Sequence, residues 1–298
     1  MNDSVPPKRI FPSSKIEAQA AKHVPSSPQT DSESYKLAFQ DMDFLLREDL
    51  RPVRFQLELL KPELFLHDAK IASTFVMYGS ARIPRPDMAD DLIAAATNDE
   101  QRKVAERLKA KSHYVDIARE LARLASRCEC DEDGLRHFVV CSGGGPSIME
   151  GANRGAADEG KESIGLNIVL PHEQLPNSYV TPELSFQFHY FALRKMHFLL
   201  RARAVAVFPG GFGTFDEFFE LLTLIQTGKV RPLPVLLFGK GFWNRVIDFE
   251  ALVDEGVIAP HDLDLIHWSE DAQEAWDYVV RFYERHPNPP RVQTAPPE

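Results

Sequence analysis

The chain has 298 residues, of which 44% are hydrophobic and 26% charged, and its formal net charge is −10 at pH 7. This acidic balance argues against a general nucleic-acid-binding protein, which needs a basic face to neutralise phosphates. No apolar run is long enough to span a membrane, and the first residues lack the hydrophobic region of a signal peptide. We therefore expect a cytoplasmic protein with neither a nucleic acid nor a membrane as partner.

Two tails are predicted to flank one domain. Residues 1–35 are rich in Ser, Pro and Lys and lack an apolar pattern, which is typical of a disordered tail, and residues 287–298 form a Pro-rich tail. Residues 36–286 are predicted to be a single Rossmann-like nucleotide-binding domain. Its first part, 36–67, is an N-terminal helical extension.

Apolar runs alternate with amphipathic stretches after this extension, whose short helices are expected to be interrupted at Pro52 and Pro62. The segment 84–111 is polar and charged, and is a candidate lid or rim of a site. Strands are predicted at 73–78, 137–140, 164–170, 184–188, 205–208, 235–238 and 263–267. Helices are predicted at 115–127, 242–254 and 271–285, and after each glycine-rich loop described below.

Nearly every predicted strand is apolar on both faces, which indicates a parallel sheet covered on both sides. The predicted fold class is therefore α/β, a Rossmann-like three-layer fold with a mostly parallel sheet plus the N-terminal helical extension.

A glycine-rich loop, residues 209–214 (PGGFGT), follows one of these strands and opens an amphipathic helix. In α/β folds ligands bind at such carboxyl ends of strands. Glycines let the backbone approach a phosphate, and the helix start supplies N–H donors and partial positive charge. Thr214 and Glu217 also have the spacing of a capping box, an alternative in which Glu217 is purely structural.

A second loop of the same design, residues 141–150 (CSGGGPSIME), follows the strand at 137–140. Ser147 and Glu150 repeat the capping spacing. If the two strands are neighbours in a parallel sheet, both helix starts face one crevice. Neither loop has the spacing of the common nucleotide-binding fingerprints. The pair predicts a site for a phosphorylated small molecule.

The loop and its helix start match P-G-G-x-G-T-x-x-E over residues 209–217, and the chain thereby resembles the Lonely Guy (LOG) family of phosphoribohydrolases, in particular its longer bacterial branch, often labelled lysine decarboxylase. Arg194-Lys195 lies upstream at the family's spacing, and residues 78–80 (YGS) and 142–146 (SGGGP) are similar to its first two glycine turns. The resemblance covers roughly residues 70–255. It implies a hydrolase, or nucleosidase, that splits the N-glycosidic bond of a nucleoside 5′-monophosphate (AMP, or a cytokinin ribotide as in cytokinin biosynthesis) into free base and ribose 5-phosphate.

The resemblance also implies the site and the assembly. Arg194 and Glu217 are the expected catalytic pair, without a metal or a cofactor, in a homodimer or larger homo-oligomer. The apolar run 221–225 supports the oligomer. The substrate-binding residues it implies are Gly79, Ser80, Gly143, Gly144, Gly145, Met149, Glu150, Lys195, Gly210, Gly211, Phe212, Gly213 and Thr214.

The expected reaction explains why these residue types suffice. Cleavage of a ribosyl C–N bond builds oxocarbenium character on the sugar, so the site needs a carboxylate to stabilise it and to activate water. Glu217, in the first turn of a helix, is expected to be ionised. Arg194 would orient the carboxylate or the ribose hydroxyls, or offset charge on the departing base. Phosphate held by the loop would fix the ribose over Glu217.

Other functions fit parts of the sequence. A non-catalytic nucleotide or molybdenum-cofactor carrier would share the fold and the phosphate cradle, but would not need the Arg194 and Glu217 pair. A nucleotide sensor would use the segment 84–111 as its interaction surface, and a pyridoxal phosphate enzyme would use Lys195. The chain has three cysteines, Cys128, Cys130 and Cys141. They are predicted to be reduced thiols, and they are too few to form a structural zinc site.

Overall fold

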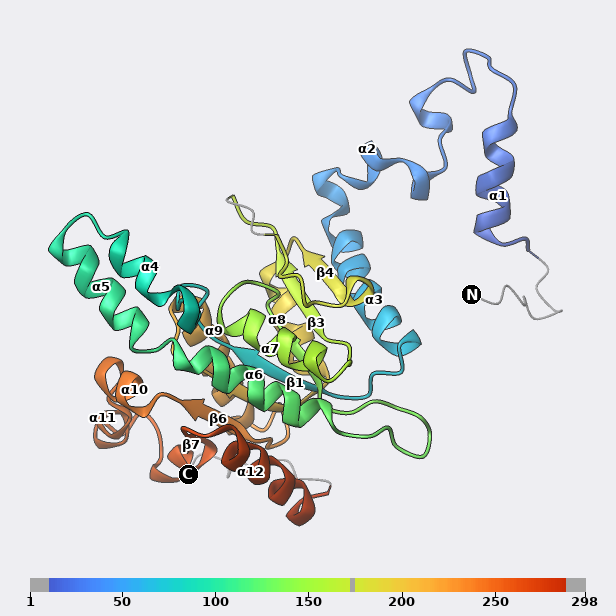
Figure 1. Cartoon of the computed structure of the whole chain (residues 1–298). Helices are drawn as coiled ribbons and strands as arrows, with labels where there is room; N and C mark the ends of the chain where they lie inside the picture. Colours follow the sequence, from blue (N-terminus) through green and yellow to red (C-terminus); the bar gives the residue numbers. More distant parts are fainter. Residues whose placement is uncertain (1–10, 172–174, 288–298) are drawn as a thin grey trace. The chain divides into compact units, whose positions relative to one another are not determined.

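A seven-stranded sheet lies at the centre of the fold (Figure 1), and every pair of neighbouring strands is parallel. The strand order is β4-β3-β2-β1-β5-β6-β7, so the chain order reverses between β1 and β5. The predicted α/β fold with a parallel sheet is confirmed. The strands are β1 Thr74–Tyr78, β2 Val139–Ser142, β3 Ile164–Ile168, β4 Ser185–Phe188, β5 Ala202–Val207, β6 Val235–Phe238 and β7 His267–Ser269.

The computed structural model describes residues 11–171 and 175–287. The chain divides into two compact units, Met1–Glu58 and Leu59–Glu298. In the first unit, the described part of the predicted tail contains the helix α1, Ser14–Ala20, none of whose residues is buried. The predicted tail at the other end lies outside the described residues from position 288 onward. The predicted domain limits stay predictions.

In the second unit, α-helices cover both faces of the sheet (Figure 1). After α1, the α-helices of the chain are α2 Met42–Leu45, α3 Arg51–Asp68, α4 Ala89–Ala94, α5 Asp99–Lys109, α6 His113–Ser126, α7 Ile148–Asp158, α8 Phe191–Leu200, α9 Phe212–Gln226, α10 Lys240–Val246, α11 Phe249–Asp254 and α12 Ala272–Arg285. Short 3₁₀ helices lie at Ala21–His23, Glu33–Tyr35, Ala38–Gln40, Glu48–Leu50, Pro86–Met88, Pro182–Leu184 and Pro260–Leu265.

The core forms two layers, one on each face of the sheet. Phe75 and Met77 of β1 pack with helices α6, α7 and α12, whereas Val76 and Tyr78 pack on the other face with α3, α8, α9 and α10. Successive strand residues point to opposite faces, so a strand covered on both sides is apolar throughout. This is the pattern from which the parallel sheet was predicted.

The helical extension differs from its prediction. Helix α3 runs through Pro62 without a break, and Pro52 is its second residue. A proline near a helix start interrupts nothing, because the first N–H groups have no intrahelical partner. Pro62 is buried, so its packing offsets the hydrogen bond that a proline removes from a helix interior.

The predicted helix at 242–254 is two helices, α10 and α11. Ile247 adopts an extended conformation between them, and the Asp248 carboxylate accepts a hydrogen bond of 3.0 Å from the Ala251 N–H. Asp248 is therefore the N-cap of a new helix, and capping outweighs the continuous helical pattern here.

The last strand was predicted too early, at 263–267. Residues Pro260–Leu265 form a 3₁₀ helix, and β7 starts only at His267. Pro260 opens this turn, and the Asp262 carboxylate accepts from the Ala259 N–H at 2.8 Å. A short apolar run alone does not distinguish such a turn from a strand.

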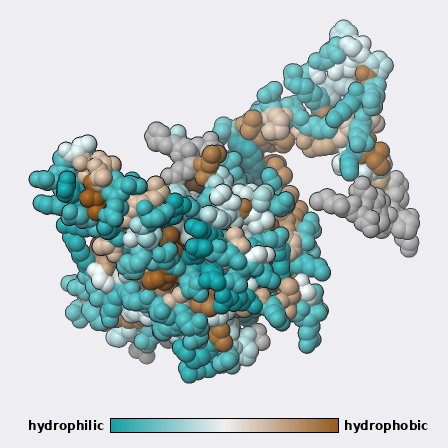
Figure 2. All heavy atoms as spheres, in the orientation of Figure 1, coloured by the Kyte–Doolittle hydropathy of each residue, from teal (hydrophilic) through white to brown (hydrophobic). Residues whose placement is uncertain are grey.

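Within residues 11–171 and 175–287, no helix combines the length and apolar character needed to cross a bilayer. The face shown in Figure 2 is mostly hydrophilic.

In the apolar run 221–225, Leu221 and Ile225 are buried in the core and Leu222 and Leu224 are half-buried, so little of this run is exposed. The oligomeric state stays a prediction.

Helix α7 is held against α6 at a very close distance. A Cβ atom on Gly155 would overlap the Arg119 carbonyl oxygen and lie 2.7 Å from Cβ of Ala122. A Cβ atom on Gly151 would lie 2.6 Å from the Val115 carbonyl oxygen. Since α7 directly follows the second glycine-rich loop, this contact fixes where that loop lies.

Gly155→Ala is expected to destabilise the protein by about 1–3 kcal/mol, because the overlap outweighs the higher helix propensity of alanine. Urea unfolding measures the change. Gly241→Ala in α10 is the matched control, because nothing lies within 4 Å of its added Cβ, and its stability should stay equal or rise slightly. If alanine proves equally harmless at both positions, the close contact between α6 and α7 is not required.

Candidate functional site

A cavity of about 820 Å³ opens where β1 and β5 end. The loops after these two strands form its centre, and parts of α8, α9 and α10 complete its walls. This is the position at which the strand order reverses, where two neighbouring loops separate and leave a crevice in α/β folds. The end of the segment 84–111 also reaches the cavity, through Leu108 and Lys111.

The structure brings most of the predicted site residues together around this cavity. Those that line it are Gly79, Ser80, Gly143, Met149, Arg194, Gly210, Gly211, Phe212, Gly213, Thr214 and Glu217. Those that do not line it are Gly144, Gly145, Glu150 and Lys195. Their individual roles stay predictions.

The first glycine-rich loop turns directly into α9. Gly211 precedes the helix and no side chain caps it. A Cβ atom on Gly210 would overlap the Thr214 side chain, so the loop folds tightly over the first helical turn. The first N–H groups of a helix have no partner within it, and here they border the cavity. N–H groups in such a position are able to bind an anion such as a phosphate.

Neither predicted capping box exists. Thr214 and Glu217 both lie inside α9, beyond its N-cap. At the second loop, Ser147 precedes α7 with a positive φ of 66°, and its hydroxyl donates to the Ile83 carbonyl instead of capping the helix. The alternative in which Glu217 is a structural cap is therefore wrong.

Glu217 is a buried carboxyl group. Its side chain is 6% exposed, and Oε2 has no hydrogen-bond partner among the described residues. Burial raises its pKa to about 7, although Lys195 and Arg194 act in the opposite direction. We expected the helix start to keep this group ionised, and that expectation is wrong because loss of hydration outweighs the favourable charges.

Arg194 enters the same cavity from α8. Its Nε donates to the Leu166 carbonyl at 2.7 Å, and its guanidinium lies 5.1 Å from the centroid of the Phe198 ring. A Cβ atom on Gly143 would be 2.7 Å from Nη2, so only glycine fits beside it. Burial lowers the pKa of Arg194 and the Glu217 carboxylate raises it. The second loop thus leaves space for this cation.

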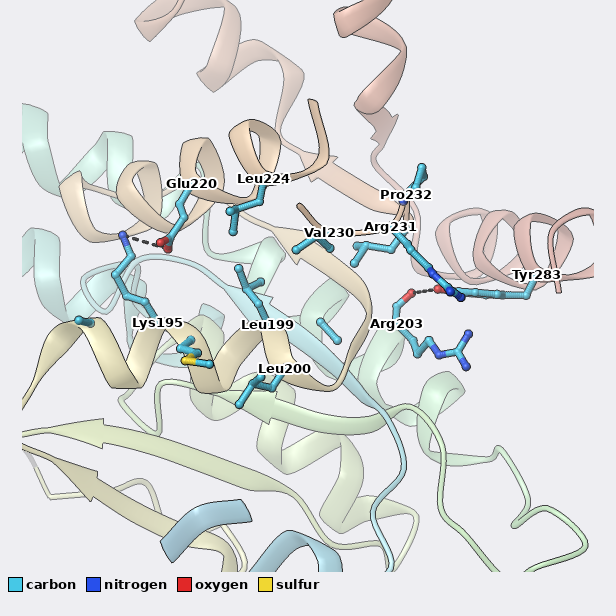
Figure 3. A pocket seen from close by; sticks show the side chains of 14 residues that line it. Lys195, Leu199, Leu200, Arg203, Glu220, Leu224, Val230, Arg231, Pro232 and Tyr283 are labelled. Atoms are coloured by element: carbon cyan, nitrogen blue, oxygen red, sulfur yellow. Dashed lines mark hydrogen bonds and ion pairs between the residues drawn. The ribbon is translucent and has the colours of Figure 1, made fainter. Parts of the chain in front are cut away.

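Lys195 faces away from this cavity. Its Nζ lies 2.9 Å from Asp216 Oδ1 and 3.1 Å from Glu220 Oε2, both on α9. Figure 3 shows it at the edge of a second cavity of about 590 Å³, together with Leu199 and Leu224. Lys195 therefore stabilises the contact between α8 and α9 and influences Glu217 through space.

Other predicted residues also lie elsewhere. Glu150 forms an ion pair with Arg85 at 3.2 Å. Gly144 has a positive φ of 73° and packs against Asn167. Among the aromatic residues in and directly after β4, Phe186 and Phe188 are buried in the core, and Phe191 lines the cavity.

The sequence did not identify several cavity residues. Tyr78 has the pattern of an ordinary core residue, because it ends an apolar strand. Phe242 and Val246 of α10 follow the end of β6, next to β5. Their position after a neighbouring strand is a signal that could have indicated them, and the signal for Tyr78 is its place directly before Gly79 in the first glycine turn.

Comparisons with known proteins identify chains that are similar to this one. A family model described as "Possible lysine decarboxylase" matches residues 149–279. The probable cytokinin riboside 5′-monophosphate phosphoribohydrolase LOGL3 of Oryza sativa subsp. japonica is 28% identical over 185 residues, which cover 59% of this chain and 80% of the relative. The cytokinin riboside 5′-monophosphate phosphoribohydrolase LOG3 of Arabidopsis thaliana is 28% identical over 188 residues, which cover 62% of this chain and 81% of the relative.

Among solved structures, the Moco carrier protein from Chlamydomonas reinhardtii is 18% identical, with a TM-score of 0.42, and the match covers 72% of this chain and 99% of that one. The parallel sheet with its two glycine-rich loops defines a Rossmann-like α/β protein. These matches support the resemblance of the chain to the Lonely Guy (LOG) family.

Glu217→Gln is expected to remove a pH dependence of stability. The folded-state pKa is about 7 against an ordinary value of 4.5, so the folded state binds more protons between these values. The resulting stabilisation is complete below pH 4.5 and is lost as the pH rises through 7. At pH 8 the variant should be more stable than the wild type by about 1–3 kcal/mol, and at pH 5 the difference should be small.

Urea unfolding at both pH values measures this effect. Glu284→Gln, at an exposed position of α12, is the control and should show no such dependence. A Glu217→Gln variant less stable than the wild type at pH 8 would mean that the ionised carboxylate is well stabilised in the folded protein.

Proposed function

We propose that the protein hydrolyses the N-glycosidic bond of a nucleoside 5′-monophosphate and releases free base and ribose 5-phosphate. The observation that carries this proposal is a buried carboxyl group, Glu217, that shares one cavity with Arg194 and with the open start of α9. The names of the relatives support it, because they describe phosphoribohydrolases of cytokinin riboside 5′-monophosphates. AMP and cytokinin ribotides are the candidate substrates.

The phosphate group binds at the first turn of α9. The unpaired N–H groups there and the helix dipole favour a dianion, and the loop glycines allow its close approach. Because Glu217 lies in the second turn of the same helix, a phosphate at the first turn places the attached ribose near its carboxyl group. Binding energy from the phosphate is thereby used to orient the reacting carbon.

Glu217 then acts on the sugar and on water. In its ionised form it stabilises the oxocarbenium character that develops at the anomeric carbon and accepts a proton from the attacking water. A pKa of about 7 suits this proton transfer, because the group is partly ionised at neutral pH and still basic. Arg194 supplies positive charge in the same cavity and offsets the charge of the departing base.

The buried carboxyl group favours an enzyme over a carrier protein. A carboxylate without a hydrogen-bond partner at Oε2 is costly to bury, and its raised pKa is the direct sign of that cost. A protein that only holds a nucleotide would gain nothing from a carboxylate that repels the bound phosphate. In a reaction that builds positive charge on the sugar, by contrast, the carboxylate stabilises that charge.

Nucleoside 5′-monophosphates should be cleaved and the matching nucleosides should not. Without the phosphate, the N–H groups at the start of α9 lose their partner, which should reduce kcat/KM by roughly 10²-fold or more. Release of free base from AMP and adenosine, followed by chromatography, measures this, and a panel of monophosphates identifies the preferred base. Equal rates on AMP and adenosine, or binding of AMP without any release of base, would contradict the proposal.

Glu217→Gln should lower kcat by about 10² to 10⁴, because the amide neither stabilises the cation nor accepts a proton. In the wild type, kcat/KM should rise with pH through about 7, because this is the pKa of Glu217. The residual activity of the variant should show no such rise with pH. Arg194→Ala should be similarly impaired, and Glu284→Gln should match the wild type. A Glu217→Gln enzyme that keeps more than about a third of its turnover would assign the reaction to another residue.

A further inference from the structure

Tyr78 carries a polar group for which the fold provides no partner. It is the last residue of β1, and its side chain points to the face of the sheet covered by α8 and α9. The ring packs edge-on against Phe198, with centroids 5.0 Å apart, and the residue is 5% exposed. Its hydroxyl oxygen has no hydrogen-bond partner among the described residues. A buried hydroxyl left in this state destabilises the folded protein unless a ligand supplies the partner.

The hydroxyls of two other tyrosines, Tyr114 and Tyr283, do have partners. The hydroxyl of Tyr114 donates to Glu270 Oε2 at 2.8 Å, and that of Tyr283 donates to the Arg203 carbonyl at 2.6 Å. Neither lines the cavity that contains Glu217, whereas Tyr78 does. Tyr78 therefore differs from these two tyrosines both in its unpaired hydroxyl and in its position at the cavity.

The groups around Tyr78 define what it can do. Burial raises its pKa well above 10, and Glu217 is the charge that raises it most, followed by Cys141, with Arg194 opposing and Glu220 adding to the rise. The hydroxyl thus stays protonated at neutral pH and is available as a donor. Oε2 of Glu217, an acceptor, is also buried and without a partner. One cavity therefore contains an unpaired donor and an unpaired acceptor.

We propose that Tyr78 is a substrate-binding residue whose hydroxyl donates a hydrogen bond to a ribose hydroxyl, which in turn donates to Glu217. This inference rests on the proposed function. A hydroxyl accepts and donates at the same time, so one ribose hydroxyl satisfies both protein groups. A phosphate oxygen cannot, because it has no proton to donate to the carboxylate. Tyr78 and Glu217 together would then distinguish ribonucleotides from their deoxy counterparts.

The test compares Tyr78→Phe with the wild type on AMP, 2′-deoxy-AMP and 3′-deoxy-AMP. On AMP, the variant should lose about 10-fold in kcat/KM. On the one deoxy substrate that lacks the bonded hydroxyl, the loss should shrink to less than about 2-fold, because neither enzyme can then form the bond. The melting temperature should not fall, because phenylalanine removes an unpaired polar atom.

Tyr114→Phe is the matched control. It breaks the bond to Glu270, so it should lower the melting temperature while leaving the relative rates on the three substrates unchanged. A Tyr78→Phe variant with an unchanged rate on AMP, or with the same loss on all three substrates, would overturn the inference.

Failure of the proposed function would be recognised separately. If the wild type releases no base from any monophosphate, calorimetric titration with the same three nucleotides still tests Tyr78. If Tyr78→Phe binds AMP more weakly than the wild type does, but both bind one of the deoxy nucleotides equally well, the result would support a role of Tyr78 in binding without a role in catalysis. Equal affinities of both proteins, or no binding by either, would overturn it.

Discussion

The burial of one carboxyl group determines much of what this site can do. Glu217 loses its hydration inside the cavity, and no direct ion pair replaces it among the described residues. Arg194 and Lys195, both on α8, only partly offset this loss, so the pKa stays near 7 instead of returning to 4.5. A stronger ion pair would stabilise the fold but would leave a weaker base.

The surrounding fold explains how such a group is held in place. The reversal of strand order between β1 and β5 opens the crevice, and the glycine-rich loop after β5 places α9 at its edge. On the other side, close packing of α7 against α6 sets the position of the second loop, where Gly143 leaves space for the guanidinium of Arg194. The glycine at 143 thus allows the close approach of a side chain, and the glycines after β5 would allow the close approach of the proposed phosphate.

Much of this architecture could be predicted from the sequence, because strand periodicity and glycine-rich loops are local signals. The failures have physical causes. The spacing of Thr214 and Glu217 is the same at a helix start and one turn further in, so it did not reveal that α9 begins at Phe212. Arg194 and Lys195 are adjacent, yet consecutive helical residues diverge by about 100°, and they face different cavities. Tyr78 resembles a core residue until its unpaired hydroxyl is seen.

The position of α8 has a consequence for how the site tolerates change. Both cations that oppose the burial of Glu217 are successive residues of this one helix. Any displacement of α8 relative to α9 therefore alters both distances at once. The pKa of Glu217 therefore depends on the spacing between α8 and α9. A substitution far from the cavity that shifts α8 slightly would change this pKa even where the shape of the cavity stays nearly the same.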